Sequence, residues 1–443
     1  MVLEERKGAN PTQYSTDVSS VSDHPNDSTT LIHSLPEEIL SEILLLLLEH
    51  PERPWGCPAF AVCRRWRNCA LRTPRLWSTI EVIHGRSLEG ILTSLERSRS
   101  APLHIKLWLR DSTVRPMLAI VGRHWSRCFQ LNIDIAHGVK DDDLLLLFPF
   151  SIDLHSLRKL DIYFNANAHY GIRPNPLFSA NDQHAIPALQ ELVIRSHLGY
   201  FGRGVNISCI GCTDLTEMVI GQAVDPVSVW EILPRCTSLQ HFVWKSSAYI
   251  ARPRDFDPFT LNALQSASLS IDKPSILFEA AQLPRLRRLH LSLPISVDEI
   301  RKIVAAGQLR TLSHLTLFLY SNFGFGQPEI LPDSLLLSLF SQLDNVEDLC
   351  LGSNMSGLQY LGSRQQLADP SSTTLVCPKL QVLRLAVDQA ISEGTLSAET
   401  LSDILSRVCR QRTNRTIPFQ THINISKAVL NLPSDLPIYE SEV

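Results

Sequence analysis

The sequence of 443 residues contains no long hydrophobic run. The longest aliphatic run, from Ile43 to Leu48, has six residues, whereas a membrane-spanning helix needs roughly 20. The opening residues also lack the apolar core of a secretory signal peptide. We therefore expect an intracellular protein, cytoplasmic or nuclear or both, that has no membrane partner.

The sequence also lacks a dominant sign of charge. It has 41 Lys and Arg residues against 45 Asp and Glu residues, which gives a formal net charge of -4. A mildly acidic chain has no overall attraction for nucleic acid or anionic lipid. We expect no nucleic-acid partner. Hydrophobic residues make up 44% of the chain, which is enough for most of it to fold.

Motifs of catalysis and cofactor binding are missing as well. Neither G-x-G pair, at Gly202 and at Gly324, continues into a nucleotide-binding loop. The sequence has no H-E-x-x-H zinc motif, no G-x-S-x-G turn and no kinase catalytic loop. We therefore expect no cofactor and no enzyme activity. An enzyme whose site is assembled from dispersed residues is a remote alternative.

Order is predicted to begin near residue 33, after a tail rich in Ser, Thr, Asp and Asn. Ser34 to Glu37 form a helix-capping box, with a proline that the first helical turn tolerates. Apolar residues follow at helical spacing as far as Leu47. A proline-rich stretch over 51–58 then separates this helix from a second helical segment over 60–70.

Three blocks of this region resemble an F-box and occur in the correct order. They are Leu35 to Ile43 (LPEEILSEI), Val62 to Trp66 (VCRRW) and Pro74 to Trp77 (PRLW). The resemblance implies a helical bundle that binds a Skp-type adaptor and, through it, a cullin. The connection between the first two blocks is longer and richer in proline than in the usual F-box. The residues that match the apolar motif, which we predict to form the adaptor-binding region, are Leu35, Pro36, Ile39, Leu40, Ile43, Val62, Trp66, Leu76 and Trp77. Some of these must hold the bundle together rather than contact the adaptor, and the sequence does not divide them.

A nine-residue pattern, apolar-x-x-apolar-x-x-apolar-x-apolar, recurs through the rest of the chain. It resembles the leucine-rich repeat, in which the last two apolar positions form a short strand that faces the core. One interval of 47 residues is about twice its neighbours, so we expect a degenerate copy near Leu269 to Ile271. Clear copies begin at Leu154, Ile186, Cys212, Cys236, Leu283, Leu309, Leu343 and Cys377, and a weaker copy begins at Trp125.

The predicted fold is therefore α/β, with a small all-α F-box bundle followed by a leucine-rich-repeat α/β solenoid of irregular repeat lengths. Residues 80–109 also resemble the segment after the F-box in proteins of mushroom-forming fungi. A parallel βαβ sheet is the competing fold, although its usual nucleotide loop is missing. The predicted divisions are a disordered tail (1–32), the F-box (33–80), a linker and solenoid start (81–120), the solenoid with a capping helix over 396–408 (121–412), and a tail (413–443).

The chain has ten cysteines, which we expect to be free thiols because no secretory signal is present. Cys209 and Cys212 have the spacing of half a zinc site. However, Cys212, Cys236 and Cys377 share the first position of the repeated pattern, where a buried cysteine acts as a small hydrophobic residue. Packing is the favoured interpretation, and metal binding is the alternative.

The eighth position of each copy should face outward on the concave side, because side chains alternate along a strand. Three successive copies place a valine there, namely Val193, Val219 and Val243. Together with His241 and His290, these valines are the predicted contacts for a protein substrate. The alternative is that valine simply favours strands and that a neighbouring loop covers these residues.

These features favour a substrate-recognition subunit of a Skp–cullin–F-box ubiquitin ligase. Its F-box would bind the adaptor, and its repeats would bind a protein substrate whose identity the sequence does not reveal. One alternative is a leucine-rich-repeat scaffold that acts outside a ubiquitin ligase. The remote alternative is an enzyme with a site on the concave face.

Overall fold

The computed structural model describes residues 35–47, 62–83, 87–110, 115–136, 154–165, 186, 188–196, 205–208, 210–246, 257–292, 295–318, 332–352, 364–366, 373–375, 377–386, 406, 408, 420–424 and 438–439. The predicted tail over 1–32 and the proline-rich stretch over 51–58 lie outside these residues. Of the predicted capping helix over 396–408, only Ser406 and Val408 are described, and both are helical.

Short helices form the amino-terminal part of the structure. Helix α1 (Glu37–Leu47) packs against helix α3 (Arg64–Arg72) and the 3-10 helix η3 (Pro74–Trp77). These helices have a hydrophobic core of their own, separate from the core of the sheet that follows. None of the described helices is long and apolar enough to cross a membrane.

A sheet of 14 strands follows, and its strands lie side by side in the order in which the chain makes them. Every pairing in this sheet is parallel. The strands are β1 (Thr79–Val82), β2 (Leu103–Leu109), β3 (Cys128–Ala136), β4 (Lys159–Asn165), β5 (Glu191–Ser196), β6 (Glu217–Ile220), β7 (His241–Lys245), β9 (Ser266–Ser270), β11 (Arg288–Leu291), β12 (His314–Phe318), β13 (Asp348–Gly352), β16 (Val382–Ala386), β17 (Gln420–Asn424) and β18 (Ile438–Tyr439).

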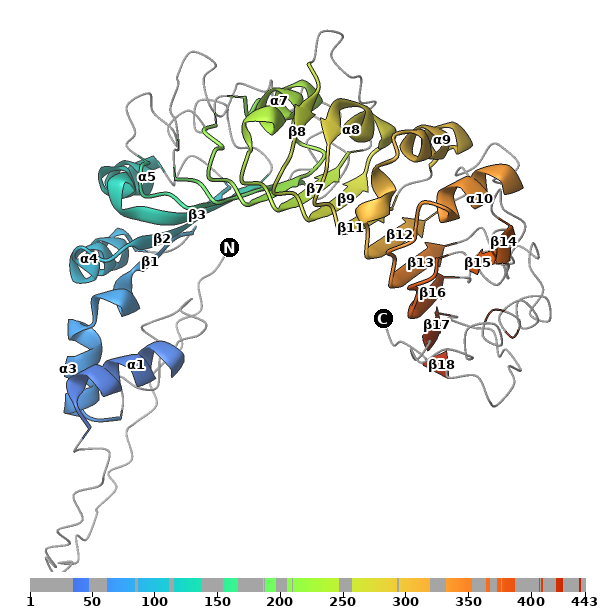
Figure 1. Cartoon of the computed structure of the whole chain (residues 1–443). Coiled ribbons are helices and arrows are strands. Elements are labelled where there is room, and N and C mark those ends of the chain that lie inside the picture. The colour runs from blue at the N-terminus through green and yellow to red at the C-terminus, as the bar shows by residue number, and fades with distance from the viewer. Residues whose placement is uncertain are drawn as a thin grey trace, which may run out of the picture.

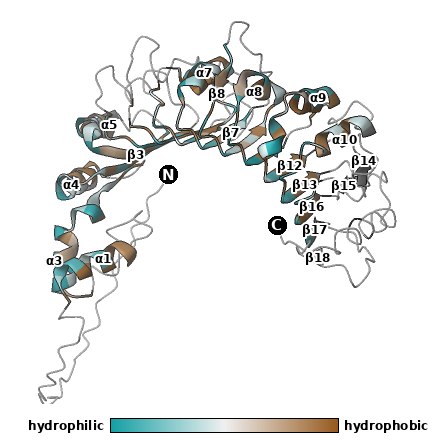
Figure 2. Cartoon of the chain, in the orientation of Figure 1, coloured by the Kyte–Doolittle hydropathy of each residue, from teal (hydrophilic) through white to brown (hydrophobic). Residues whose placement is uncertain are grey.

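The sheet curves into an arc, and helices lie along its outer side (Figure 1). The helices carry both hydrophobic and hydrophilic residues (Figure 2), as expected for elements with one face on a core. They are α4 (Leu88–Ser98), α5 (Arg115–Val121), α7 (Pro226–Ile232), α8 (Ser275–Ala280), α9 (Val297–Ala305) and α10 (Asp333–Phe340), with the 3-10 helices η5 (Gly122–Arg127), η6 (Leu233–Arg235) and η7 (Gln308–Thr311).

Two short strand pairs lie outside the large sheet. Strand β8 (Phe259–Thr260) pairs in parallel with β10 (Ala281–Gln282). Strand β14 (Arg364–Gln366) pairs in antiparallel fashion with β15 (Thr373–Leu375). The architecture as a whole is mixed α/β, as the sequence predicts.

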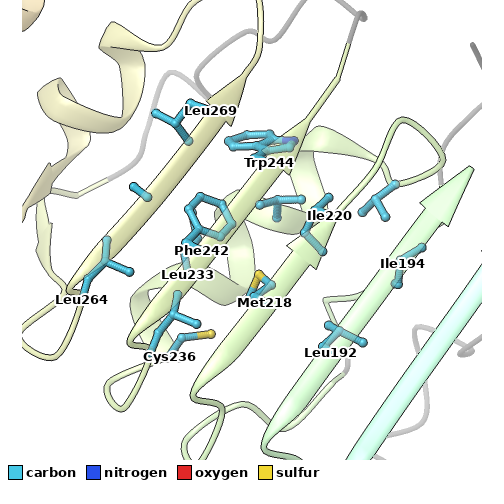
Figure 3. Packing of buried hydrophobic residues seen from close by; sticks show 14 of the residues in the cluster. Leu192, Ile194, Met218, Ile220, Leu233, Cys236, Phe242, Trp244, Leu264 and Leu269 are labelled. Atoms are coloured by element: carbon cyan, nitrogen blue, oxygen red, sulfur yellow. The ribbon is translucent and has the colours of Figure 1, made fainter. Parts of the chain in front are cut away.

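The apolar positions of the nine-residue pattern form the core between the sheet and the outer elements. On β5, β6 and β7 the seventh and ninth positions are buried, and Figure 3 shows their side chains in pairs along neighbouring strands. Trp244 of β7 also packs edge-on against Trp230 of α7, with ring centroids 5.5 Å apart. These pairs are Leu192 and Ile194, Met218 and Ile220, and Phe242 and Trp244.

The first and fourth positions form the same tight turn in each copy from Leu154 onward. In every one, the backbone N–H of the fourth residue donates a hydrogen bond to the carbonyl oxygen of the first residue, at 3.0 to 3.3 Å. The turn leads directly into the strand, and both of its apolar residues are buried. Buried apolar residues at these positions thus belong to one repeated backbone shape.

The degenerate copy lies where the sequence predicts it, near Leu269. It begins at Leu261 and places Ala267 and Leu269 inward on β9. Alanine at the seventh position weakens the hydrophobic signal of this copy, whereas Ile271 is buried just after the strand. The hydrogen bonds show the true alignment, since Leu264 donates to Leu261 as in the other copies.

The sheet also starts earlier and ends later than predicted. Strand β1 follows η3 after one residue, so the sheet begins at the boundary between the predicted F-box and the predicted linker and solenoid start. Strands β17 and β18 extend the sheet into the predicted tail over 413–443. Strand β17 has only one large apolar side chain, Ile423, and therefore has no hydrophobic pattern in sequence; its pairing with β16 defines it.

Two of the cysteines in the shared first position lie close together. Both thiols donate to the carbonyl oxygen of Ile232, at 3.6 Å from Cys212 and 3.3 Å from Cys236. A hydrogen bond between the two thiols and burial raise the pKa of Cys236, while the same hydrogen bond lowers the pKa of Cys212. Cys209 lies outside the described residues, among which no group of three metal-ligating side chains occurs.

We predict that Cys212→Ala lowers the free energy of unfolding by about 1 kcal/mol, as a small cavity would. Cys212→Val should cost less, because it keeps apolar volume. Denaturant unfolding of the two variants measures these costs. Metal analysis of the purified protein should find no stoichiometric zinc; one zinc per chain that Cys212→Ala removes would contradict the packing interpretation.

Candidate functional site: the amino-terminal helices and the concave face

The core of the amino-terminal helices is built from one face of α1. Leu40 and Leu44, four residues apart, are buried against Trp66 and Trp77. The indole N–H of Trp77 donates to the carbonyl oxygen of Ala70 at 2.9 Å, which satisfies the polar atom of this buried ring. The remaining buried members are Cys69, Ala70 and Leu76.

Polar contacts also join α1 to the helices beneath it. The hydroxyl of Ser41 lies 3.0 Å from the hydroxyl of Thr73 and 3.2 Å from the sulfur of Cys69. The guanidinium of Arg65 donates to the carbonyl oxygen of Leu35, which ties down the start of the α1 segment. Together with the apolar core, these bonds hold α1 in one orientation.

A second face of α1 is apolar and exposed. Ile39 is 48% exposed, Leu46 66% and Leu47 61%, while Ile43 is half-buried. These four residues follow the spacing i, i+4, i+7, i+8 and therefore form one stripe along the helix. Contiguous exposed apolar surface of this kind marks an interaction site. We call these four residues the α1 stripe.

The structure divides the nine residues predicted for adaptor binding. Leu40, Trp66, Leu76 and Trp77 are buried and hold the bundle together. The accessible members are Leu35 and Ile43, which are half-buried, and Pro36, Ile39 and Val62, which are exposed.

Leu46 and Leu47 belong to the exposed stripe but were not among the predicted residues. The signal for them was present, since they continue the helical spacing from Ile39. It was missed because these two leucines follow the last F-box-like residue of the first block.

No flexible linker separates the bundle from the sheet. Trp77 belongs to the core of the bundle, and Ile80, three residues later, belongs to the core of the sheet. The guanidinium of Arg97 on α4 lies 4.5 Å from the centroid of the Trp77 ring. The backbone N–H of His104 on β2 also donates to the carbonyl oxygen of Ser78 at 2.9 Å. The position of the bundle is therefore fixed relative to the first strands.

The register of the strands aligns the eighth positions in a single row across the concave face. The predicted substrate residues Val193, Val219 and Val243 are direct neighbours in this row. His290 lies two strands beyond Val243, and His241 lies in a parallel row. In order from β1 to β17, the row contains Glu81, Lys106, Asn132, Asp161, Val193, Val219, Val243, Ser268, His290, Thr316, Cys350, Arg384 and His422.

The valines are less exposed than predicted. Val193 is only 8% exposed, so the prediction of an exposed strip of three valines was wrong. Ion pairs lie on both sides of it: Lys159 with Glu191, and Arg195 with Asp161 at 2.7 Å. Asp161 is the register neighbour of Val193 on β4, and Glu191 and Arg195 lie two residues from it on β5. Val219 and Val243, which lie farther from the pairs, are half-buried and present some apolar surface.

The histidines of the predicted substrate set differ in their surroundings. His241 is exposed, whereas His290 is half-buried. Burial lowers the pKa of His290, and the positive charge of Lys245 lowers it further. Lys245 on β7 and His290 on β11 therefore face the same region, and both effects favour the neutral form of the imidazole.

Comparison with known proteins identifies one part of the chain. Residues 32–82 match the family model described as F-box-like. None of the curated proteins matches the chain in sequence. The matched residues include α1, α3, η3 and β1, and thus the α1 stripe and its supporting core. Residues 32–82 are therefore an F-box-like domain.

Proposed function

We propose that this protein is a substrate-recognition subunit of a ubiquitin ligase. F-box domains typically bind Skp-type adaptors. The α1 stripe supports such a partner, because four apolar side chains on one face of a helix would otherwise remain in water. This exposed stripe within an F-box-like domain is the observation that carries the proposal. The adaptor would link the chain to a cullin.

We also propose that the curved sheet is a leucine-rich-repeat solenoid that binds the protein substrate. Strands in chain order, helices on the outer side and the recurrent turn support this assignment. The resemblance of residues 80–109 to fungal proteins supports the fungal type. The concave face, where no helix of the described part of the chain lies in Figure 1, is the substrate surface in this proposal.

The proposed mechanism is positioning rather than chemistry. The chain would hold its substrate near a ubiquitin-loaded enzyme and raise the effective concentration of the reacting groups. Contacts of Trp77 with Arg97, and of Ser78 with His104, support a fixed orientation of the amino-terminal helices relative to the first strands of the sheet. In this proposal the protein is not itself an enzyme.

The α1 stripe supplies the first test. The double variant Ile39→Glu, Leu46→Lys should lose capture of a Skp-type adaptor in co-expression, because it places charges on the apolar contact. Its melting temperature should stay close to that of the wild type, because both side chains are exposed. By contrast, Leu44→Ala should lower stability by about 2–5 kcal/mol, since Leu44 is buried.

The matched control for this test is Leu88→Glu, Leu92→Lys. These two leucines are exposed on α4, outside the F-box-like domain, and the control makes the same changes of charge. It should capture the adaptor normally. Full capture by the folded stripe variant would refute the proposed interface, and recovery of the adaptor without a cullin would favour a scaffold outside a ligase.

The second test concerns the concave face. Val219→Glu, Val243→Glu should remove substrate proteins from affinity purifications made with the proteasome blocked, while adaptor capture persists. The control is Val227→Glu, which places the same charged residue at an exposed valine on α7, at the outer side. If mass spectrometry finds an unchanged set of partners for a folded double variant, these valines do not contact the substrate.

A further inference from the structure

Strand β9 differs from its neighbours in the residues that it presents to the concave face. Ser266, Ser268 and Ser270 alternate with buried Ala267 and Leu269. The three serines therefore lie on the concave side, where their short side chains carry hydroxyl groups that donate and accept hydrogen bonds. Ser270 already contacts Ser292, which follows β11.

Cationic and imidazole side chains lie on both sides of this serine strand. The register places His241 of β7, Ser266, Arg288 of β11 and His314 of β12 side by side in one row. Lys245 is the register neighbour of Ser270. His241, Lys245 and Arg288 are exposed, and His314 is half-buried. We call His241, Lys245, Arg288, His290, His314 and the three serines the β9 patch.

The patch has no carboxylate of its own. Strands β7, β9, β11 and β12, all described in full, contain neither Asp nor Glu. The nearest concave carboxylates in register lie at its two ends, on Glu217 of β6 and Asp348 of β13. Asp348 is paired with Arg384, at 3.0 Å, on the side away from the patch. A local positive region thus exists in a chain whose formal net charge is -4.

We propose that the β9 patch binds a short acidic segment of a protein substrate, rich in Asp and Glu. This inference rests on the proposed function and names the chemistry of the substrate. Lys245 and Arg288 would pair with carboxylates, and the serine hydroxyls would donate hydrogen bonds to them. The imidazoles add N–H donors in either protonation state.

The dimensions and borders of the patch favour a short peptide over a nucleic acid. Four neighbouring strands at about 4.8 Å spacing span about 14 Å, the reach of about four extended residues. Beyond that width, Glu217 on β6 would repel a continuing polyanion. A nucleic acid carries its charge without interruption along the backbone, whereas an acidic peptide segment can end where the patch ends.

The experiment measures binding of synthetic peptides to the purified full-length chain by fluorescence anisotropy. The probes are a labelled peptide of Asp, Glu and Gly, the same peptide with Asn and Gln for the acids, and an RNA oligomer of equal charge. The acidic peptide should bind more tightly than both others. Lys245→Glu, Arg288→Glu should weaken its binding by roughly tenfold or more, as expected for losing two charge contacts.

The matched control is Arg301→Glu, Arg310→Glu, which makes the same change of net charge on α9 and η7. It should bind the acidic peptide as the wild type does. Equal binding of the acidic and neutral peptides, tighter binding of the RNA, or equal losses in the two double variants would overturn the inference. Adaptor capture is measured in parallel, because its failure in the wild type would contradict the proposed function instead.

Discussion

Parallel backbone pairing between consecutive strands is the interaction on which the rest of the structure depends. At the residue before each strand, an N–H donates to the carbonyl oxygen of the matching residue in the preceding copy. This series runs without a break from Arg158 to Gln381, at 2.8 to 2.9 Å. Because the matching residue holds the same place in every copy, the register cannot slip without breaking the whole series.

That register has consequences on both faces of the sheet. On the helix side it stacks the apolar pairs into one continuous core, which no single copy could form alone. On the concave side it brings together residues that are far apart in the chain, such as His241, Ser266, Arg288 and His314. The surface chemistry of the concave face therefore follows from an alignment that the buried residues and the backbone determine.

The connection between the F-box-like domain and the sheet is short. With Trp77 in one core and Ile80 in the other, two residues separate the two buried side chains. Such a short connection leaves little conformational freedom, and the contact of Arg97 with Trp77 reduces it further. A partner bound to the F-box-like domain would thus be held at a defined distance from a partner bound to the curved sheet.

Much of the fold was predictable from local patterns. The F-box-like blocks and the nine-residue pattern are both hydrophobic signals in short windows, and the structure contains helices and inward-facing strand pairs at these positions. Strand β17 could not be predicted in this way, because it has little hydrophobic signal and depends on pairing with β16. The start of the copy at Leu261 was not evident for a similar reason, since alanine holds one of its inward positions.

The sequence by itself determined which residues alternate, and therefore which ones lie on the core side of each strand. Only the tertiary structure decided which outward residues are accessible. Val193, Val219 and Val243 are alike in the pattern, yet two ion pairs from β4 and β5 flank Val193 alone. In the same way, Leu40 and Ile39 are adjacent in the F-box-like block, but packing buries one and leaves the other exposed. Exposure depends on neighbours that are distant in the sequence, and a pattern of nine residues does not contain them.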